Sequence, residues 1–339
     1  MLHPWQRRGL LLMALTGLTA CQVLTGPSAP ATPMPIRLPM GYIANVQFAP
    51  FYVAVEKGYF AQEGIELSFD YSFETNGVQL VGAGQLPFAL VSGEQVPLAR
   101  AQGLPVVMVA QWYQRYPIAV FATADKGIRT PQDLRGRRVG LPGFFGASYV
   151  GFKALLYATG MRDEEVEAVD LGGFTQVAAV KEGRVDAAVG YINNEPLVLR
   201  RAGLAVNVID VADYVALVGN GIITNERTIR DQPDLVRRFL RAFLRGLRDT
   251  LRNPQEAFEI SKKYVEGLSG ENERAQWEVL QATLPLWQAE VPGRSDLRAW
   301  QQMAEVLVRM GQLKEPGDLP AAFTNAFVEE LWPQVERGR

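Results

Sequence analysis

Residues 41–60, GYIANVQFAPFYVAVEKGYF, carry the pattern that most constrains the fold of this chain. An extended apolar run at residues 36–40 precedes them and predicts a strand. After a polar and aromatic loop, Pro50 stands where the first turn of a helix accepts proline, and Gly58 is placed to end that helix. α/β folds build binding crevices from such units, at the carboxyl ends of their strands. The segment therefore predicts a βα unit with a candidate binding loop.

The same alternation of strand and helix patterns continues along the chain. Strands are expected at residues 65–73, 88–91, 105–112 and 118–123, and then at 138–141, 166–171, 185–190, 205–209 and 219–224. The run at 105–112 is apolar throughout, as in strands buried on both faces of a sheet. From residue 231 the pattern becomes that of amphipathic helices. The sequence predicts an α/β fold with mostly parallel sheets, and its length favours two lobes.

The amino terminus has the pattern of an export signal. Arg7 and Arg8 precede an apolar run at residues 9–18, which is too short to span a bilayer, and small residues lead to Cys21. A cysteine after Leu-x-Ala resembles the bacterial lipobox, which implies cleavage of residues 1–20 and lipid (palmitate) on Cys21; a chance cysteine after an ordinary signal is the alternative. Residues 21–35 are rich in Pro, Ala and Thr and suit a flexible tether. We expect a protein anchored on the extracytoplasmic face of the cell membrane.

Removal of this signal leaves a chain without histidine or free thiol, because His3 and Cys21 are the only residues of their kinds. Ser-His-Asp and Cys-His catalysis and His/Cys metal sites are thereby excluded, while catalysis by carboxylates alone is not. The loss of Arg7 and Arg8 changes the formal charge from −2 to −4. Arginines at 237–252 are mixed onto a periodic apolar helix, which favours a solvated face over a nucleic-acid site. We expect no cofactor, no metal and no nucleic-acid partner.

Three segments resemble the NMT1/THI5-like family of periplasmic-type solute-binding proteins: FAPFYVAVEKGYFAQEGIEL, IRTPQDLRGRRVGLP and KEGRVDAAVGYINNEP. The resemblance implies a two-lobed, type II periplasmic-binding-protein-like fold. Lobe one would hold residues 36–122 and 222–339, and lobe two residues 123–221. It further implies a non-enzymatic solute-binding component of an ABC importer, whose partners are the permease and ATPase subunits. The family's eukaryotic pyrimidine synthases depend on a histidine and a cysteine-rich motif, which this chain lacks.

Aromatic and polar side chains recur where the predicted strands end. The candidate ligand-binding residues are Tyr42, Asn45, Phe48, Ser92, Glu94, Trp112, Tyr113, Phe145, Ser148, Tyr149, Tyr191, Asn193 and Glu195. Together they predict a cleft that stacks a flat ring and hydrogen-bonds its edge. The alternatives are that the aromatic rings fill the core and that Glu94 and Glu195 are solvated loop acids. The resemblance assigns contact with the ligand's polar groups to the 42–48 loop, Asn193 and Glu195.

The expected ligand is a neutral aromatic heterocycle. Arg115 is the only strong cation near these loops, which disfavours a small anion. Within the family the chain resembles the riboflavin-binding members, which implies riboflavin, and next those that bind thiamine's pyrimidine precursor (formylaminopyrimidine or hydroxymethylpyrimidine). A secreted enzyme that uses Glu94 and Glu195 as a carboxylate pair is the alternative from another class.

Overall fold

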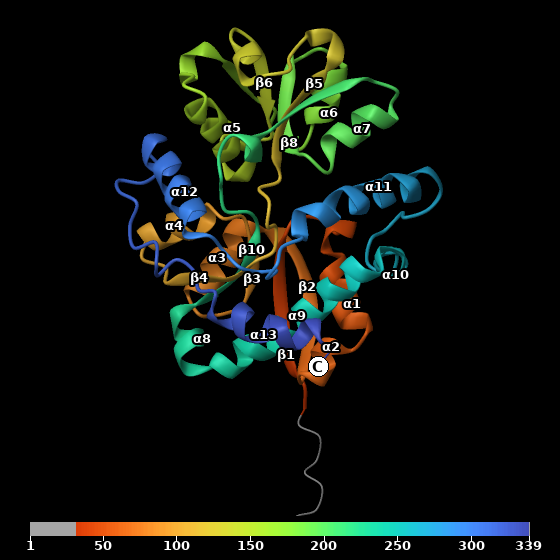
Figure 1. Ribbon diagram of the computed structural model, residues 1–339, viewed down its shortest axis with the longest axis vertical. Coiled ribbons are helices and arrows are strands. Elements are labelled where there is room, and N and C mark those ends of the chain that lie inside the picture. The colour runs from red at the N-terminus through yellow and green to blue at the C-terminus, as the bar shows by residue number, and fades with distance from the viewer. Residues whose placement is uncertain (1–31, 339) are drawn as a thin grey trace, which may run out of the picture. The chain divides into compact units, whose positions relative to one another are not determined.

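The computed structural model describes residues 32–338 (Figure 1). Cys21, the predicted signal at residues 1–20 and most of the predicted tether lie outside the described residues. No helix within residues 32–338 has both the length and the apolar character needed to cross a membrane.

The first lobe is built on five strands. β1 (Met34–Gly41) pairs in parallel with β2 (Ile65–Phe73). β3 (Ala89–Val91) and β4 (Val106–Gln111) flank β10 (Gly221–Asn225), which runs antiparallel to both. β4 is buried along its whole length, as its continuous apolar sequence predicts.

The second lobe contains a five-stranded sheet in the order β7-β6-β8-β5-β9. Its strands are β5 (Ile118–Thr123), β6 (Arg138–Leu141), β7 (Glu167–Asp170), β8 (Ala187–Tyr191) and β9 (Val206–Asp210). β6 is parallel to β7 and β8, whereas β5 is antiparallel to β8 and β9. The reversed strand is β10 in lobe one and β5 in lobe two. Each of these two strands comes directly after the chain has crossed from one lobe to the other. The predicted two-lobed α/β fold is confirmed. Because β5 pairs with β8 and β9, the first crossing lies between β4 and β5, earlier than the predicted boundary after residue 122. The other lobe boundary stays a prediction.

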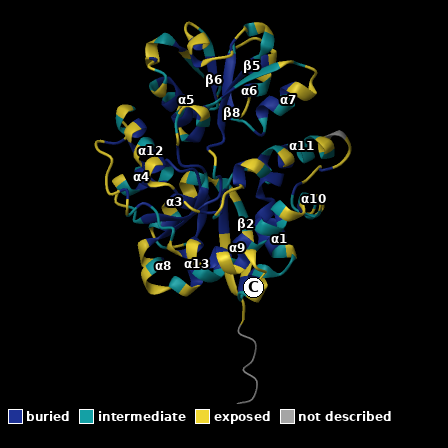
Figure 2. Cartoon of the chain, viewed as in Figure 1, coloured by how far each residue is buried: buried dark blue, intermediate teal, exposed yellow. Residues whose placement is uncertain are grey.

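Helices cover both sheet systems. They are α1 (Ala49–Glu56), α2 (Tyr59–Gln62), α3 (Glu74–Gly82), α4 (Gln95–Ala101), α5 (Gly146–Ala158), α6 (Gln176–Lys181), α7 (Glu195–Arg201), α8 (Glu226–Asp231), α9 (Pro233–Arg252), α10 (Pro254–Ser261), α11 (Gly270–Trp287), α12 (Leu297–Arg309) and α13 (Ala326–Glu336). Helix α9 lies next to α1, α2 and α13 and buries its apolar face in the largest core cluster (Figure 2). That face includes Leu235, Phe239, Phe243 and Leu247. The turn-spaced apolar pattern of this segment therefore predicts both the helix and its buried side.

The carboxyl-terminal segments return to lobe one. Gly293 bridges to Gln111, and Phe323 bridges to Met108, so both extend the edge of β4. Two helices of this part also contact lobe two, α12 against α5 and α11 against α7. The carboxyl-terminal part is therefore attached to lobe one and has contacts with both lobes.

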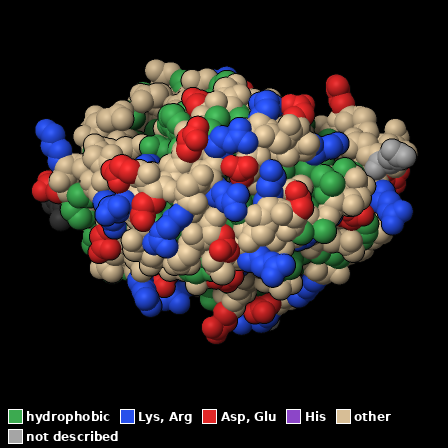
Figure 3. Space-filling model, turned by 90° about the horizontal axis from the view of Figure 1, so that it is seen from above, with side chains coloured by type: hydrophobic (Ala, Val, Ile, Leu, Met, Phe, Trp, Pro, Cys, Tyr) green, Lys and Arg blue, Asp and Glu red, His purple; other side chains and the backbone are tan. Residues whose placement is uncertain are grey.

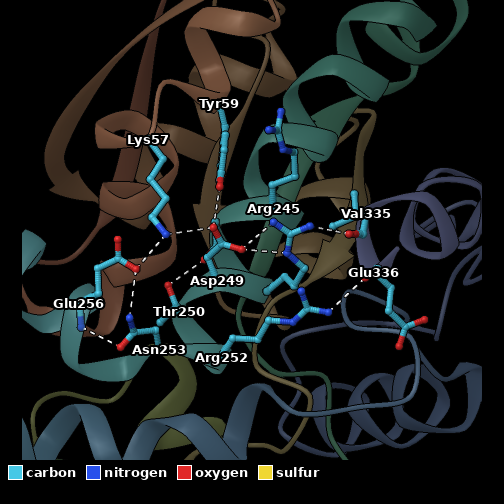
Figure 4. A network of polar contacts seen from close by, with 12 residues as sticks. Lys57, Tyr59, Arg245, Asp249, Thr250, Arg252, Asn253, Glu256, Val335 and Glu336 are labelled. Carbon is cyan, nitrogen blue, oxygen red and sulfur yellow. Dashed lines mark hydrogen bonds and ion pairs between the residues drawn. The ribbon is translucent and has the colours of Figure 1, made fainter. Parts of the chain in front are cut away.

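The arginines of α9 are engaged within the protein (Figure 4). Arg248 and Arg252 donate to the backbone carbonyls of Val335 and Glu336 at the end of α13, which supplies partners for carbonyls that a helix leaves free. Arg241 pairs with Glu63 at 2.8 Å. Acidic and basic side chains are also interspersed over the face seen in Figure 3. These arginines of α9 therefore have partners within the protein, and their presence on the helix can be explained by these contacts.

Candidate functional site

The candidate residues lie where strands of both lobes end. β1 leads to Tyr42, β3 leads to Ser92, and β8 ends at Tyr191. The Tyr42 ring contacts the Phe174 ring of lobe two edge to face, with centroids 5.3 Å apart. Strand ends of the two lobes therefore meet at Tyr42, as the crevice rule for α/β folds leads one to expect.

Four phenylalanines near these strand ends are exposed. Phe73, Phe145 and Phe174 are 70%, 71% and 64% exposed, and Phe144 is 46% exposed. Phe73 is the last residue of β2 and pairs with Gly41 in the strand register. Gly41 directly precedes Tyr42 in the sequence. Phe174 also borders an open surface hollow of lobe two. These rings give the strand ends of both lobes exposed apolar surface, the kind of surface that marks interaction sites where it is contiguous.

Three of the other predicted aromatic residues, Phe48, Trp112 and Tyr113, are buried in a stack. Trp112 lies between Phe48 and Trp287, with ring centroids 5.6 Å from each. Tyr113 contacts Trp112 edge to face and approaches Tyr191 of lobe two at 6.4 Å. Phe48, Trp112 and Tyr113 therefore form packed structure beneath the strand ends, which matches the core-filling alternative for Trp112.

The loop after β1 is held by its own polar side chains. The Asn45 side-chain oxygen accepts from the backbone N–H of Gln47 at 3.0 Å. The Tyr113 hydroxyl donates to the side-chain oxygen of Gln47 at 2.9 Å. Gln47, which the sequence analysis did not single out, therefore fixes the loop to the buried stack.

Asn193 links the lobes. Its side-chain N–H donates to the Thr283 hydroxyl on α11 at 2.7 Å, and that hydroxyl donates to the carbonyl of Val279. Asn193 is buried, and its side-chain oxygen has no partner among the described residues. A buried acceptor without a partner is costly, so this oxygen is an unusual feature of the region between the lobes.

Glu195 begins α7 and is buried. Its carboxylate accepts from the backbone N–H of Tyr191 at 2.8 Å. Burial raises the pKa of Glu195 to about 7. Hydrogen bonds from the backbone and from the Asn194 side chain oppose part of this rise. A Cβ at Gly190 would lie 2.7 Å from the Glu195 carboxylate, so glycine leaves the space that this side chain occupies. Burial, followed by the charge of Glu195, raises the pKa of Tyr42 to about 12.

Ser92 joins two carboxyl groups. Its hydroxyl lies 2.5 Å from an oxygen of Glu74 and 2.5 Å from an oxygen of Glu94. Asn220 lies 3.4 Å from Glu74 and 3.3 Å from the Tyr191 hydroxyl, so this cluster also reaches lobe two. Burial, then the charge of Glu94, raises the pKa of Glu74 to about 8. The sequence analysis missed Glu74, although it follows the predicted strand at 65–73 directly.

The remaining predicted residues lie on or beside α5 of lobe two. Ser148 is buried in the first turn, and Tyr149 is partly buried with its ring 5.4 Å from that of Phe144.

Arg115 pairs with Asp210 at 2.7 Å and with Asp213 at 2.6 Å. Because two carboxylates already neutralise it, Arg115 offers little attraction to an anionic ligand.

Two α/β lobes joined by two crossings, with aromatic and hydrogen-bonding side chains at facing strand ends, define a solute-binding protein of the periplasmic type. The chain belongs to the NMT1/THI5 like family, whose family model matches residues 45–257. It is 43% identical to the riboflavin-binding protein RibY of Chloroflexus aurantiacus, over 94% of this chain and 96% of that protein.

A second relative is the formylaminopyrimidine-binding protein of Halalkalibacterium halodurans, 34% identical over 74% of this chain and 76% of that one. Among solved structures, the periplasmic aliphatic sulphonate binding protein SsuA of Escherichia coli superimposes with a TM-score of 0.71. The superposition covers 86% of this chain and 97% of the SsuA chain. Because the sequences are only 12% identical, this similarity is evidence for the fold of our protein and for nothing further. Both sequence relatives are named as binding proteins, which supports a solute-binding role over an enzymatic one.

Proposed function

We propose that this protein binds riboflavin between its lobes and delivers it to the membrane permease of an ABC importer. The observation that carries the proposal is the 43% identity with a riboflavin-binding protein over almost the full length of both chains. The exposed aromatic rings agree with it, because a three-ring flavin needs more stacking surface than a single pyrimidine ring does.

The proposed contacts use side chains of both lobes. Phe145 and Phe174 of lobe two and Tyr42 of lobe one would stack on the flavin rings. The buried oxygen of Asn193, which has no partner within residues 32–338, would accept from the N–H of the ring edge. Glu195 would hold a second polar group of the ligand.

Fluorescence titration of riboflavin tests the proposal directly. We expect quenching with a dissociation constant of micromolar or tighter, about −8 kcal/mol or better. Phe145→Ala should weaken binding by about 1–3 kcal/mol, by analogy with base stacking on aromatics. Tyr214→Ala is the matched control, since Tyr214 is an exposed aromatic of lobe two at the end of the 211–213 turn, and it should bind as the unaltered protein does.

A thiamine pyrimidine precursor is the second candidate. The 34% identity with the formylaminopyrimidine-binding protein favours it. Absence of flavin quenching beside clear binding of a formylaminopyrimidine would transfer the assignment to this ligand. A carboxylate-dependent enzyme is separated from both candidates by incubation with the bound ligand, which a binding protein returns unchanged.

Lipid anchoring is the remaining part of the proposal, and it rests on the sequence around Cys21. We expect the protein to partition with membranes. Cys21→Ser should release it or leave the signal uncut, because no lipid can then be attached. Equal membrane partitioning of a correctly cleaved Cys21→Ser protein would refute anchoring through this residue.

A further inference from the structure

The junction between β2 and α3 places an exposed ring beside a partly exposed carboxyl group. Phe73 is the last residue of β2 and Glu74 is the first of α3. Gly41 lies opposite Phe73 in the register, and a Cβ there would lie 2.7 Å from the Glu74 Cγ. Gly41 also has φ +77°, so this position both favours glycine and leaves space for Glu74. The loop after β1 and this junction therefore form one edge of lobe one, where Tyr42 contacts lobe two.

The hydrogen bonds of Ser92 require a proton on one of the two glutamates. A serine hydroxyl donates one hydrogen bond, yet its oxygen lies 2.5 Å from a carboxyl oxygen of both Glu74 and Glu94. One carboxyl group must then donate to the hydroxyl, while the other accepts from it. The pair therefore holds one proton and one negative charge.

The pair has no neutralising cation among residues 32–338. The polar partners of Glu74 are the backbone N–H and hydroxyl of Ser92 and the side chain of Asn220, and those of Glu94 are Ser92 and Gln95. The titratable groups that face the pair are the hydroxyls of Tyr116 and Tyr191, which are neutral donors. Glu94 is fully buried, and its second oxygen has no partner among the described residues. The negative charge is therefore uncompensated at the edge that faces lobe two.

We propose that Phe73 and Glu74 are further ligand-contacting residues, and that Glu74 makes the site select a neutral, hydroxyl-bearing ligand over its phosphorylated or sulfonated form. Phe73 supplies a stacking face for the ring. Glu74 accepts hydrogen bonds from hydroxyl groups of the chain that the ring carries, and the negative charge that it shares with Glu94 repels an anion at the same place. The assignment of the ring and its chain rests on the proposed function.

Competition between three flavins tests this selectivity. The probes are riboflavin, riboflavin 5′-phosphate, and lumiflavin, which keeps the ring but lacks the hydroxylated chain. We expect the unaltered protein to prefer riboflavin over its phosphate at pH 7. The double variant Glu74→Gln, Glu94→Gln removes both the shared proton and the negative charge, and it should reduce that preference at least tenfold, which corresponds to about 1.4 kcal/mol. It should leave lumiflavin affinity within about twofold, because lumiflavin has no hydroxyl group to lose.

Three further variants keep the test decisive. Glu74→Ala, Glu94→Gln also removes both carboxyl groups and should reduce the preference in the same direction, which covers the case in which the first double variant does not fold. Phe73→Ala should weaken all three flavins alike, since it removes the stacking face. Glu66→Gln removes an exposed carboxylate from β2 and is the matched charge control. An unchanged preference in a folded double variant would overturn the role of Glu74, and unchanged flavin affinity in Phe73→Ala would overturn the role of Phe73.

Failure of the proposed function gives a different result. If the unaltered protein binds no flavin, riboflavin transport is refuted, and the same variants are tested with hydroxymethylpyrimidine and its phosphate. An infrared carbonyl band of a protonated carboxylic acid at pH 7, lost in Glu74→Gln and in Glu94→Gln, reports the shared proton without any ligand. A spectrum that both substitutions leave unchanged would contradict proton sharing.

Discussion

Glu195 is a carboxyl group whose surroundings disfavour its charge. Burial raises its pKa from 4.5 to about 7, so the folded protein keeps a proton that the unfolded chain releases between these pH values. The folded state binds more protons in this window, and the unfolding free energy should therefore fall as pH rises from about 4.5 to 7. The contribution of Glu195 is fully present below pH 4.5 and lost above its folded pKa.

Urea unfolding midpoints as a function of pH measure this contribution. Glu195→Gln should flatten the decline between pH 4.5 and 7 by on the order of 2 kcal/mol, because glutamine cannot ionise. Glu167→Gln, which replaces an exposed carboxylate on β7, should keep the slope of the unaltered protein. Parallel curves for the Glu195→Gln and unaltered proteins would contradict a raised pKa.

At the scale of elements, α9 fixes α13 through arginine side chains. Arg248 is largely buried and donates to the carbonyl of Val335 at 2.6 Å, and it also pairs with Asp249. Arg248→Met keeps much of the aliphatic stem but leaves both acceptors without this donor. We expect a loss of about 1–2 kcal/mol of unfolding free energy in urea, typical of a hydrogen bond to a charged group.

Arg230→Met is the matched control for this prediction. Arg230 is exposed and pairs only with its neighbour Asp231 among the contacts of the described chain. Its loss should change the unfolding free energy by about 0.5 kcal/mol or less. Equal effects of the two substitutions would show that the α9–α13 contact adds no more than a surface ion pair.

The elements that the sequence pattern predicts are those whose signal is local. The apolar run at 105–112 becomes β4, and the turn-spaced Leu235, Phe239 and Phe243 become the buried face of α9. The recurrence of polar and aromatic residues after strands also predicts which loops carry the candidate site. These signals lie within one element and its cap, so no tertiary contact is needed to detect them.

The part that the pattern does not predict depends on contacts between distant residues. Glu74 meets Asn220 across 146 positions, and Asn193 meets Thr283 across 90. Whether Trp112 lines a cleft or lies beneath it depends on where Trp287 packs, far along the chain. The periodicity of one segment does not specify its partners, so the sequence predicts where loops follow strands but not how the side chains of those loops are oriented.

At the scale of the whole molecule, polar contacts from one segment of lobe two bring the lobes together. Tyr191 contacts Asn220, Asn193 donates to Thr283, and Arg201 pairs with Glu278 at 3.3 Å. All three lobe-two residues lie in the segment that runs from the end of β8 through the following turn to the end of α7. An opening motion about the two crossings would break these contacts, and a ligand held between the lobes would favour the arrangement that keeps them.

Asn193→Ala should therefore shift the molecule toward an open arrangement and weaken riboflavin binding. A ligand that binds only the closed arrangement loses apparent affinity in proportion to the closed fraction, and we expect a loss of about 3–10-fold. Thr283→Val should weaken binding less, because it removes the acceptor of the same bond but keeps the Asn193 oxygen for the ligand. In small-angle scattering, saturating riboflavin should reduce the radius of gyration of the unaltered protein and of both variants, with more ligand needed for the variants.

The double variant Asn193→Ala, Thr283→Val distinguishes closure from an independent role of each residue. If the two residues act through their mutual hydrogen bond, the double variant should bind riboflavin with about the affinity of whichever single variant binds it less tightly. Additive losses would mean that each side chain contacts the ligand or its own lobe separately. A radius of gyration that riboflavin leaves unchanged in the unaltered protein would instead indicate a rigid, preformed site, and the loss in Asn193→Ala would then report a direct contact of Asn193 with the ligand.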